Sequence, residues 1–231
     1  MYKTYDIMVV VAHPDDAEFG IAGTVAGWVK NGKSVIYVVC TNGDKGTSDR
    51  SLAPEKLAVI RQQEQRNAAA KLGVGEVVFL NMPDQQLEDT PQFRENIVRL
   101  FRRYRPSIVA TSDPYRKYVW HRDHRIIGQV VLDAAFPFAR DHLAYPEMIE
   151  EGLEPHKVKE LLFFGAEDIN YHVDIYATFQ QKLAALQCHE SQMKEMQFDD
   201  LESWLKKRCQ KMAEHTELEL AEAFHRVHMP A

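Results

Sequence analysis

Short, nearly continuous apolar runs alternate along this chain with longer segments in which apolar residues recur every three or four positions. The run DIMVVVA at 6–12 is typical of a strand that is buried on both faces. The segment 22–29 then has apolar residues at i, i+3, i+4 and i+7, which predicts a helix that ends at Asn31 and Gly32. A strand followed by a helix is thus the first unit of the pattern.

The same alternation continues to the middle of the chain and predicts the class of fold. Repeated strand–helix units predict a Rossmann-like α/β fold, in which a mainly parallel sheet has helices on both faces. The segment 138–159 is expected to be a long surface excursion, and the chain from about 176 to 231 is expected to be helical. Further strands are expected at 34–41, 76–80, 107–111, 160–165 and 171–175, and further helices at 54–72, 93–104 and 125–136.

Composition limits the domain organisation and the class of partner. The chain has 231 residues, of which 45% are hydrophobic, and no Gly/Ser/Pro-rich linker divides it, so one domain over 1–231 is expected. A net charge of −6 argues against a nucleic-acid partner. The chain contains no apolar run of 18 residues, so a membrane span is not expected. Three cysteines without CxxC spacing fit a reducing compartment, which predicts a cytoplasmic protein.

Ionisable side chains follow the predicted strands at the points where the strands end. The segment His13–Asp16 follows the first strand, Asp44 the second, Asp84 the third and the HRDH segment His121–His124 the fourth. Ligands of open α/β sheets bind beyond the carboxyl ends of the strands, where these side chains are expected to gather. The pattern therefore predicts a functional site at this edge.

The residue types at this edge favour a metal site. His13 and Asp16 are three residues apart, as are His121 and His124, so each pair can face one centre. Imidazoles with one carboxylate and an open position hold a catalytic zinc, which lowers the pKa of bound water to about 7. A carboxylate outside the ligand set can then act as general base, and Asp15 suits that role.

Each of these residues also has a purely structural interpretation. Asp15 and Asp16 are good N-terminal caps of a helix, and His121 and His124 taken alone are typical of surface histidines. The two pairs together, each at the end of a predicted strand, favour the metal site. A nucleotide-binding enzyme is disfavoured because the first loop lacks GxGxxG, and a serine hydrolase because GxSxG is absent. A metal-binding scaffold protein would not need Asp15.

The chain also resembles a known family. AHPDDAEFGIAGT, TNGDKG, RQQE, HRDHRIIG and HESQ occur in the order found in the LmbE-like (PIG-L) zinc-dependent N-deacetylases, from about Asp6 to Gln192. The runs CTNGDKGTSDRSLAPEKLAVIRQQE and EGLEPHKVKELLFF look most like the diacetylchitobiose deacetylase branch. The resemblance implies one Zn²⁺ per subunit on His13, Asp16 and His124, although Fe²⁺, Co²⁺ or Mn²⁺ suits the same ligands.

The resemblance also implies roles for the neighbouring residues. Asp15 looks like the general base, and His121 looks like the histidine that stabilises the oxyanion, with Asp123 orienting it. Arg122 stands where the family more often has proline, which changes the rim of the pocket and leaves the ligand positions intact. The implied reaction is removal of the N-acetyl group from a small glycoside of N-acetylglucosamine, and a homo-oligomer, a trimer or hexamer, is expected. The alternatives are deacetylation of a thiol-cofactor precursor and a non-enzymatic metal-binding role.

Four further residues are candidates for substrate binding, and each has a structural alternative. Asp44 is a candidate for sugar hydroxyls or completes a turn, and Arg61 faces the site or forms an ordinary helical pair with Glu64. Trp120 suits the apolar face of a sugar ring or fills the core. His189 is near the site by the family match, whereas by position it is a histidine at a helix end.

Overall fold

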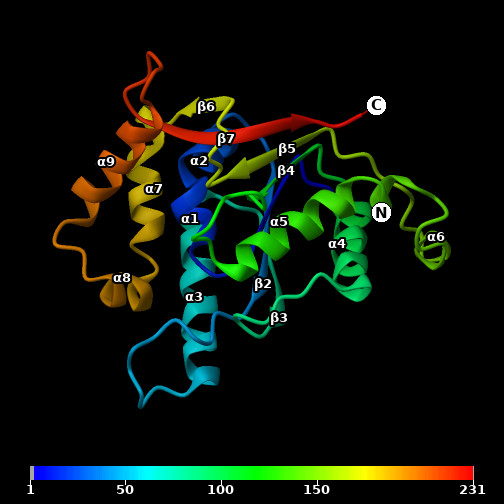
Figure 1. Ribbon diagram of the computed structural model, residues 1–231, viewed down its shortest axis with the longest axis horizontal. Coiled ribbons are helices and arrows are strands. Elements are labelled where there is room, and N and C mark those ends of the chain that lie inside the picture. The colour runs from blue at the N-terminus through cyan, green and yellow to red at the C-terminus, as the bar shows by residue number, and fades with distance from the viewer. Residues whose placement is uncertain (1–2, 231) are drawn as a thin grey trace.

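The computed structural model describes residues 3–230 and contains a seven-stranded sheet in the order β3-β2-β1-β4-β5-β7-β6 (Figure 1). The five strands β1 to β5 run parallel, and β7 is antiparallel to both of its neighbours. The strands are β1 (Ile7–Val11), β2 (Val35–Thr41), β3 (Glu76–Met82), β4 (Ile108–Ser112), β5 (Glu160–Phe164), β6 (Tyr171–Asp174) and β7 (Ala221–His228).

Helices cover both faces of this sheet, α4 and α5 on the right of Figure 1 and α7 and α9 on the left. None of the helices in the described range 3–230 combines the length and the apolar character that crossing a bilayer requires. The helices are α1 (Asp16–Gly20), α2 (Ala22–Lys30), α3 (Pro54–Leu72), α4 (Pro91–Tyr104), α5 (Arg122–Ala135), α6 (Glu147–Glu150), α7 (Phe179–Leu186), α8 (Glu190–Met196) and α9 (Leu201–Met212), with short 3₁₀ turns η1 (Phe138–Arg140) and η2 (Tyr176–Thr178).

Strand β1 lies inside the sheet between β2 and β4, and its two faces pack into separate core layers. Met8 and Val10 pack toward α4 and α5, whereas Val9 and Val11 pack toward the helices that follow β1 and β2. Successive strand side chains point to opposite faces, so a strand covered on both sides reads as one continuous apolar run. The predicted α/β fold with a mainly parallel sheet in one domain is confirmed; residues 1, 2 and 231 of the predicted range lie outside the described residues.

The prediction of a helical chain from about 176 to 231 is correct only in its first part. The segment is helical in η2, α7, α8 and α9 up to Met212, and then returns to the sheet as β7. The sequence AEAFHRVH of β7 is short and carries charged residues at several positions, so its apolar pattern alone does not identify a strand. Pairing with both β5 and β6 decides its conformation.

Candidate active site

The loops at the carboxyl ends of β1 and β4 bring the two motifs together. Strands β1 and β4 are parallel neighbours, so the loops that follow them start at the same edge of the sheet. His13 follows β1, and Asp16 begins α1. His121 caps the N-terminus of α5, where its Nδ1 accepts a hydrogen bond from the backbone N–H of Asp123 at 3.2 Å. His124 lies in the first turn of the same helix.

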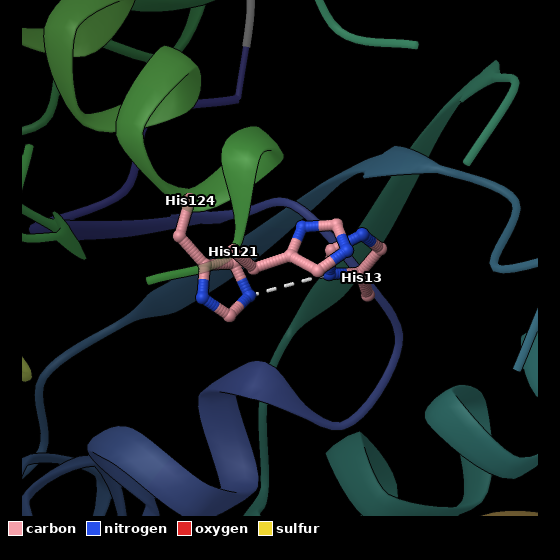
Figure 2. A group of neighbouring side chains, drawn as sticks. All are labelled: His13, His121 and His124. Atoms are coloured by element: carbon pink, nitrogen blue, oxygen red, sulfur yellow. Dashed lines mark hydrogen bonds between the residues drawn. The ribbon is translucent and has the colours of Figure 1, made fainter. Parts of the chain in front are cut away.

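The side chains of His13, Asp16 and His124 converge, and Asp16 faces the two imidazoles with different oxygens. His13 Nδ1 lies 3.3 Å from both His124 Nε2 and Asp16 Oδ2, and His124 Nε2 lies 3.0 Å from Asp16 Oδ1. The edge of a tetrahedron with zinc–nitrogen or zinc–oxygen bonds of about 2.0–2.1 Å is about 3.3 Å long. The observed spacing therefore fits a tetrahedral metal ion. Figure 2 shows the imidazole of His121 beside this group, its ring centre 4.6 Å from that of His13.

The other nitrogen of His13 faces two buried carboxylates. His13 Nε2 lies 2.9 Å from Asp84 Oδ1 and 3.2 Å from Asp123 Oδ2. Histidine and two aspartates form a second group with the residue types of a metal site, but the oxygens of Asp123 already accept hydrogen bonds from the backbone N–H groups of Gln85 and Leu87. A carboxylate so placed accepts the Nε2 proton of His13 and leaves Nδ1 free to bind a metal.

This arrangement differs from the expected role of Asp123. Its carboxylate was expected to orient His121, whereas it lies against His13 and contacts His121 only through the backbone N–H. Burial, with the positive charges of His13 and His124, lowers the pKa of His121, so this imidazole is favoured in its neutral form. Because Nδ1 accepts the backbone hydrogen bond, the proton of neutral His121 resides on Nε2.

Electrostatics separate the two aspartates of the first motif. Burial opposes the charged form of both, but the facing His124 and His13 hold the pKa of Asp16 well below its usual range. Burial raises the pKa of Asp15 to about 6, although the nearby Arg61 guanidinium acts in the opposite direction. The two adjacent carboxylates therefore differ in pKa. Asp16 stays ionised and suits a cation, whereas Asp15 is able to exchange a proton near neutral pH.

A pocket of about 620 Å³ opens beside these residues. Asp15, Asp16 and His124 line one end, and Trp120 and Trp204 contribute aromatic surface. The edge of the Trp120 ring meets His124 with 4.6 Å between ring centres, and its indole N–H donates to the carbonyl of Asp113. The indole is thus fixed next to the proposed ligand group, with part of its surface open.

The other residues expected to bind substrate are placed differently. Arg61 is 3% exposed and donates to the carbonyls of Gly43 and Pro14 and to the carboxylate of Asp15. His189 has no exposed surface and contacts Glu18, so it has no face to offer a ligand. Asp44 is half-buried and accepts a hydrogen bond from the backbone N–H of Asp84. These three side chains support the loops around the site.

Three residues around the site were given no firm role from the sequence. Glu18 and Gln65 lie within quoted motifs or next to them, and both are fully buried although they are polar, a combination that only the structure reveals. Asp84, which was expected to follow the third strand, contacts His13. Arg122, which stands where the family more often has proline, is exposed and lies 3.9 Å from Glu88.

Imidazoles and carboxylates gather at the carboxyl edge of the parallel part of the sheet, and these are the residue types that hold a catalytic metal ion. The model of the PIG-L family, GlcNAc-PI de-N-acetylase, matches residues 8–135. The chain belongs to the PIG-L family, as its motifs predicted. The relatives described below are deacetylases, which are amidohydrolases, so the expectation of an enzyme of this class is also confirmed.

Individual relatives are similar over most of the chain. Diacetylchitobiose deacetylase of Thermococcus kodakarensis is 32% identical over 200 residues, which cover 87% of this chain and 74% of the relative. The 1D-myo-inositol 2-acetamido-2-deoxy-alpha-D-glucopyranoside deacetylase of Mycobacteroides abscessus is 27% identical, with 82% of each chain covered. The structure of N,N'-diacetylchitobiose deacetylase from Pyrococcus horikoshii superposes with a TM-score of 0.90 at 28% identity, covering 96% of this chain and 84% of that one.

Proposed function

We propose that this protein is a zinc-dependent deacetylase that releases acetate from an N-acetylglucosamine-containing small glycoside, with diacetylchitobiose as the first candidate. One observation carries the proposal. His13 Nδ1 lies 3.3 Å from His124 Nε2 and from Asp16 Oδ2, His124 Nε2 lies 3.0 Å from Asp16 Oδ1, and Asp15 lines one pocket together with Asp16 and His124. A ligand group with an additional buried carboxylate is what amide hydrolysis by a metal requires.

Zinc is the proposed metal because the ligand spacing fits tetrahedral coordination by two nitrogens and one carboxylate. Bound zinc would supply a water of pKa about 7 and polarise the amide carbonyl. Fe²⁺, Co²⁺ and Mn²⁺ accept the same residue types and remain alternatives that a metal analysis distinguishes. The acidic pair Asp84 and Asp123 would hold His13 in the tautomer that leaves Nδ1 unprotonated.

The remaining residues would carry out the proton transfers. Asp15 accepts the proton of the attacking water and then delivers it to the departing amine. His121, neutral and protonated on Nε2, donates to the oxygen of the acetamido group as negative charge develops there. Trp120 offers an aromatic face to the sugar ring at the entrance. The contacts of each side chain with its neighbours support these proposed roles.

The proposed substrate class is supported by what the relatives share. The names of the Thermococcus and Mycobacteroides relatives both specify removal of an acetyl group from an acetamido sugar, although the remainder of the two molecules differs. A pocket of about 620 Å³ lies in the range of small-molecule sites, which span roughly 300–1,000 Å³. A thiol-cofactor precursor, such as an N-acetylglucosaminyl malate or inositol, is the second candidate because relatives of that branch also cover most of the chain.

Acetate release tests the proposal directly. The zinc-loaded protein is incubated with N-acetylglucosamine, diacetylchitobiose and the N-acetylglucosaminyl malate and inositol, in parallel with Asp15→Asn. We expect release from at least one compound and a decrease of about 10²–10⁴-fold in kcat for Asp15→Asn with zinc retained, the range of a lost general base. No release from any of them by a zinc-containing protein would favour the metal-binding scaffold.

The same assay has a predictable pH dependence. Only ionised Asp15 can accept a proton, and burial raises its pKa to about 6. Because the charge of a bound cation lowers this pKa further, we expect the kcat/KM of the zinc-loaded protein to fall with decreasing pH at or below about pH 6. An acid limb well above pH 6 would contradict the assignment of Asp15 as the base.

We further propose a cytoplasmic homo-oligomer, a trimer or hexamer. The three cysteines, Cys40, Cys188 and Cys209, are all free, as in a reducing compartment. Light scattering of the purified protein distinguishes these assemblies from a monomer.

A further inference from the structure

The backbone of Asp15 adopts a conformation that needs external support. Its φ of 100° and ψ of −25° lie in the left-handed region, which side chains other than glycine rarely occupy. Asp15 precedes α1, and its side chain makes no capping hydrogen bond there. Strained residues of this kind persist only where surrounding contacts fix them. The contacts of Asp15 therefore indicate what keeps this carboxylate beside the ligand group.

Two residues one turn apart on α3 hold this turn of the chain. Arg61 donates to the carbonyl of Pro14 at 2.6 Å and to Asp15 Oδ2 at 3.2 Å. Gln65 Oε1 accepts the backbone N–H of Asp15 at 3.0 Å. Residues four apart on a helix share a face, so both side chains reach the same turn. Arg61 fixes the carboxylate, and Gln65 fixes the backbone that carries it.

The amide of Gln65 is itself oriented by a buried carboxylate. Its Nε2 lies 3.1 Å from both Oε1 and Oε2 of Glu18, and a carboxylate accepts only from the NH₂ side of an amide. This contact directs Oε1 of Gln65 toward the N–H of Asp15. Glu18 and Gln65 both have 0% exposed surface, so water does not compete for these hydrogen bonds.

His189 completes the chain from a remote part of the sequence. Its Nε2 lies 3.0 Å from Glu18 Oε2, and neither side chain is exposed. Ser191, two residues after His189, donates hydrogen bonds from its backbone N–H and its hydroxyl to the carboxylate of Glu64 on α3. The start of α8 is thereby attached to α3, beside which it lies (Figure 1). The carboxylate of Glu18 thus contacts both Gln65 and His189.

We infer that Gln65 is a positioning residue for the deacetylase reaction, and that Glu18 and His189 hold it so that Asp15 keeps its left-handed conformation. This inference rests on the proposed function, in which Asp15 is the base. The buried chain His189–Glu18–Gln65–Asp15 joins the C-terminal half of the protein to the proton acceptor without contacting the substrate. It also explains why a motif as remote as HESQ accompanies the site.

The test compares Gln65→Met with Gln63→Met, the same change at an exposed position on α3. Methionine keeps the length of the side chain and removes its hydrogen bonds. We expect Gln65→Met to lower kcat by about 10–100-fold, the effect of a misplaced reacting group, with KM within twofold and full zinc content. Gln63→Met should match the wild type. Unchanged kcat in a zinc-loaded Gln65→Met protein, even with a lower Tm, would overturn the inference.

A second pair of variants protects the test against simple misfolding. His189→Gln retains an N–H donor near the position of Nε2, whereas His189→Leu removes it. We expect His189→Gln to recover most of the kcat that His189→Leu loses. Equal kcat in the two variants would contradict a role of the hydrogen bond to Glu18.

Crystal structures of the wild type and of Gln65→Met provide a readout that is independent of activity. We expect the φ of Asp15 to leave the left-handed region in the variant, and an unchanged φ would overturn the inference. If the wild type releases no acetate from any acetamido sugar, the proposed function fails. The crystal structures then still decide whether Gln65 fixes Asp15.

Discussion

Both ring nitrogens of His13 have a role in the proposed site, and the two must differ in protonation. Nδ1 needs a free electron pair to bind a metal, and Nε2 needs an acceptor for its proton. Asp84 and Asp123 supply that acceptor. Burial disfavours the charged imidazole, yet the carboxylates of Asp16 and Asp123 raise the pKa of His13 well above its usual value in the metal-free protein. A cation at Nδ1 would replace the second proton that these carboxylates favour.

Asp123→Asn tests this arrangement. The amide keeps the size of the side chain but removes the negative charge beside His13 Nε2, so the imidazole becomes a weaker ligand. We expect the affinity for zinc to fall by about 10–100-fold, as for other carboxylates behind a ligating histidine. Competition with a chromogenic chelator measures it. Asp133→Asn, farther along α5, is the control, and equal zinc affinities of the two variants would refute this role of Asp123.

Residue types and their spacing predicted where the site lies, but not which atoms meet. Periodicity placed the motifs HPDD and HRDH at the ends of strands, and the family resemblance implied His13, Asp16 and His124 as the ligands. The direction of the Asp123 carboxylate depends on the backbone N–H groups of Gln85 and Leu87, which belong to another loop. The burial of Arg61 and His189 likewise depends on tertiary packing, which local sequence does not encode.

At the scale of elements, the segment 138–159 between α5 and β5 shows how a mostly irregular stretch of chain is held in place. The segment 138–159 was expected to be a surface excursion, yet Met148 and Leu153 are buried against the sheet. Arg102 of α4 is 2% exposed and donates to five backbone carbonyls of this connection. The acceptors are Phe138, Ala139, Asp141, Ala144 and Tyr145. The guanidinium of Arg102 therefore satisfies carbonyl groups that would be hydrogen-bonded within a helix or sheet in a regular element.

Arg102→Met should destabilise the protein severely. Methionine keeps the apolar stem but leaves several carbonyls without a donor, and each unsatisfied buried group costs about 1–3 kcal/mol. Because the loop can partly relax toward water, we expect the free energy of unfolding to fall by about 3–5 kcal/mol in urea titrations. Arg50→Met, at an exposed position outside this connection, should change it by less than about 0.5 kcal/mol. A loss below about 1 kcal/mol for Arg102→Met would show that this connection does not depend on the guanidinium.

Periodicity identified most elements because each strand buried on both faces and each amphipathic helix carries its own signal. The run IMVVV and the helix Pro91–Tyr104 are of this kind. Strand β7 carries no comparable signal, since its conformation depends on pairing with β5 and β6, which come from earlier parts of the chain. Non-local pairing is the part of this fold that a single sequence does not reveal.

At the scale of the whole molecule, β7 connects the C-terminal region to the first helices. Glu222 accepts hydrogen bonds from the backbone N–H groups of Gly23 and Thr24 and pairs with Lys182 of α7 at 2.6 Å. Lys182 also donates to the carbonyls of Glu18 and Phe19 at the end of α1. The last strand therefore fixes the helix that begins with Asp16. The site thus depends on segments from both ends of the chain.

A metal bound at the site would add a cross-link of the same long range, because His13 and His124 lie 111 positions apart. Binding to the folded state alone stabilises it by about 2.7 kcal/mol when free zinc is 100-fold above its Kd. For a chain of this size that corresponds to a rise of roughly 5–10 °C in Tm. We expect EDTA to lower Tm by this amount and added Zn²⁺ to restore it, as calorimetry measures.

Two controls make the result specific to the proposed ligands. His124→Ala removes one ligand and should abolish most of the zinc-dependent shift, although its metal-free Tm stays measurable. Mg²⁺ prefers six oxygen ligands and should not replace zinc at a site with two imidazoles. Equal Tm values with and without zinc, or an undiminished shift in His124→Ala, would mean that the histidines and Asp16 do not form the metal site, and the proposed deacetylase mechanism would lose its basis.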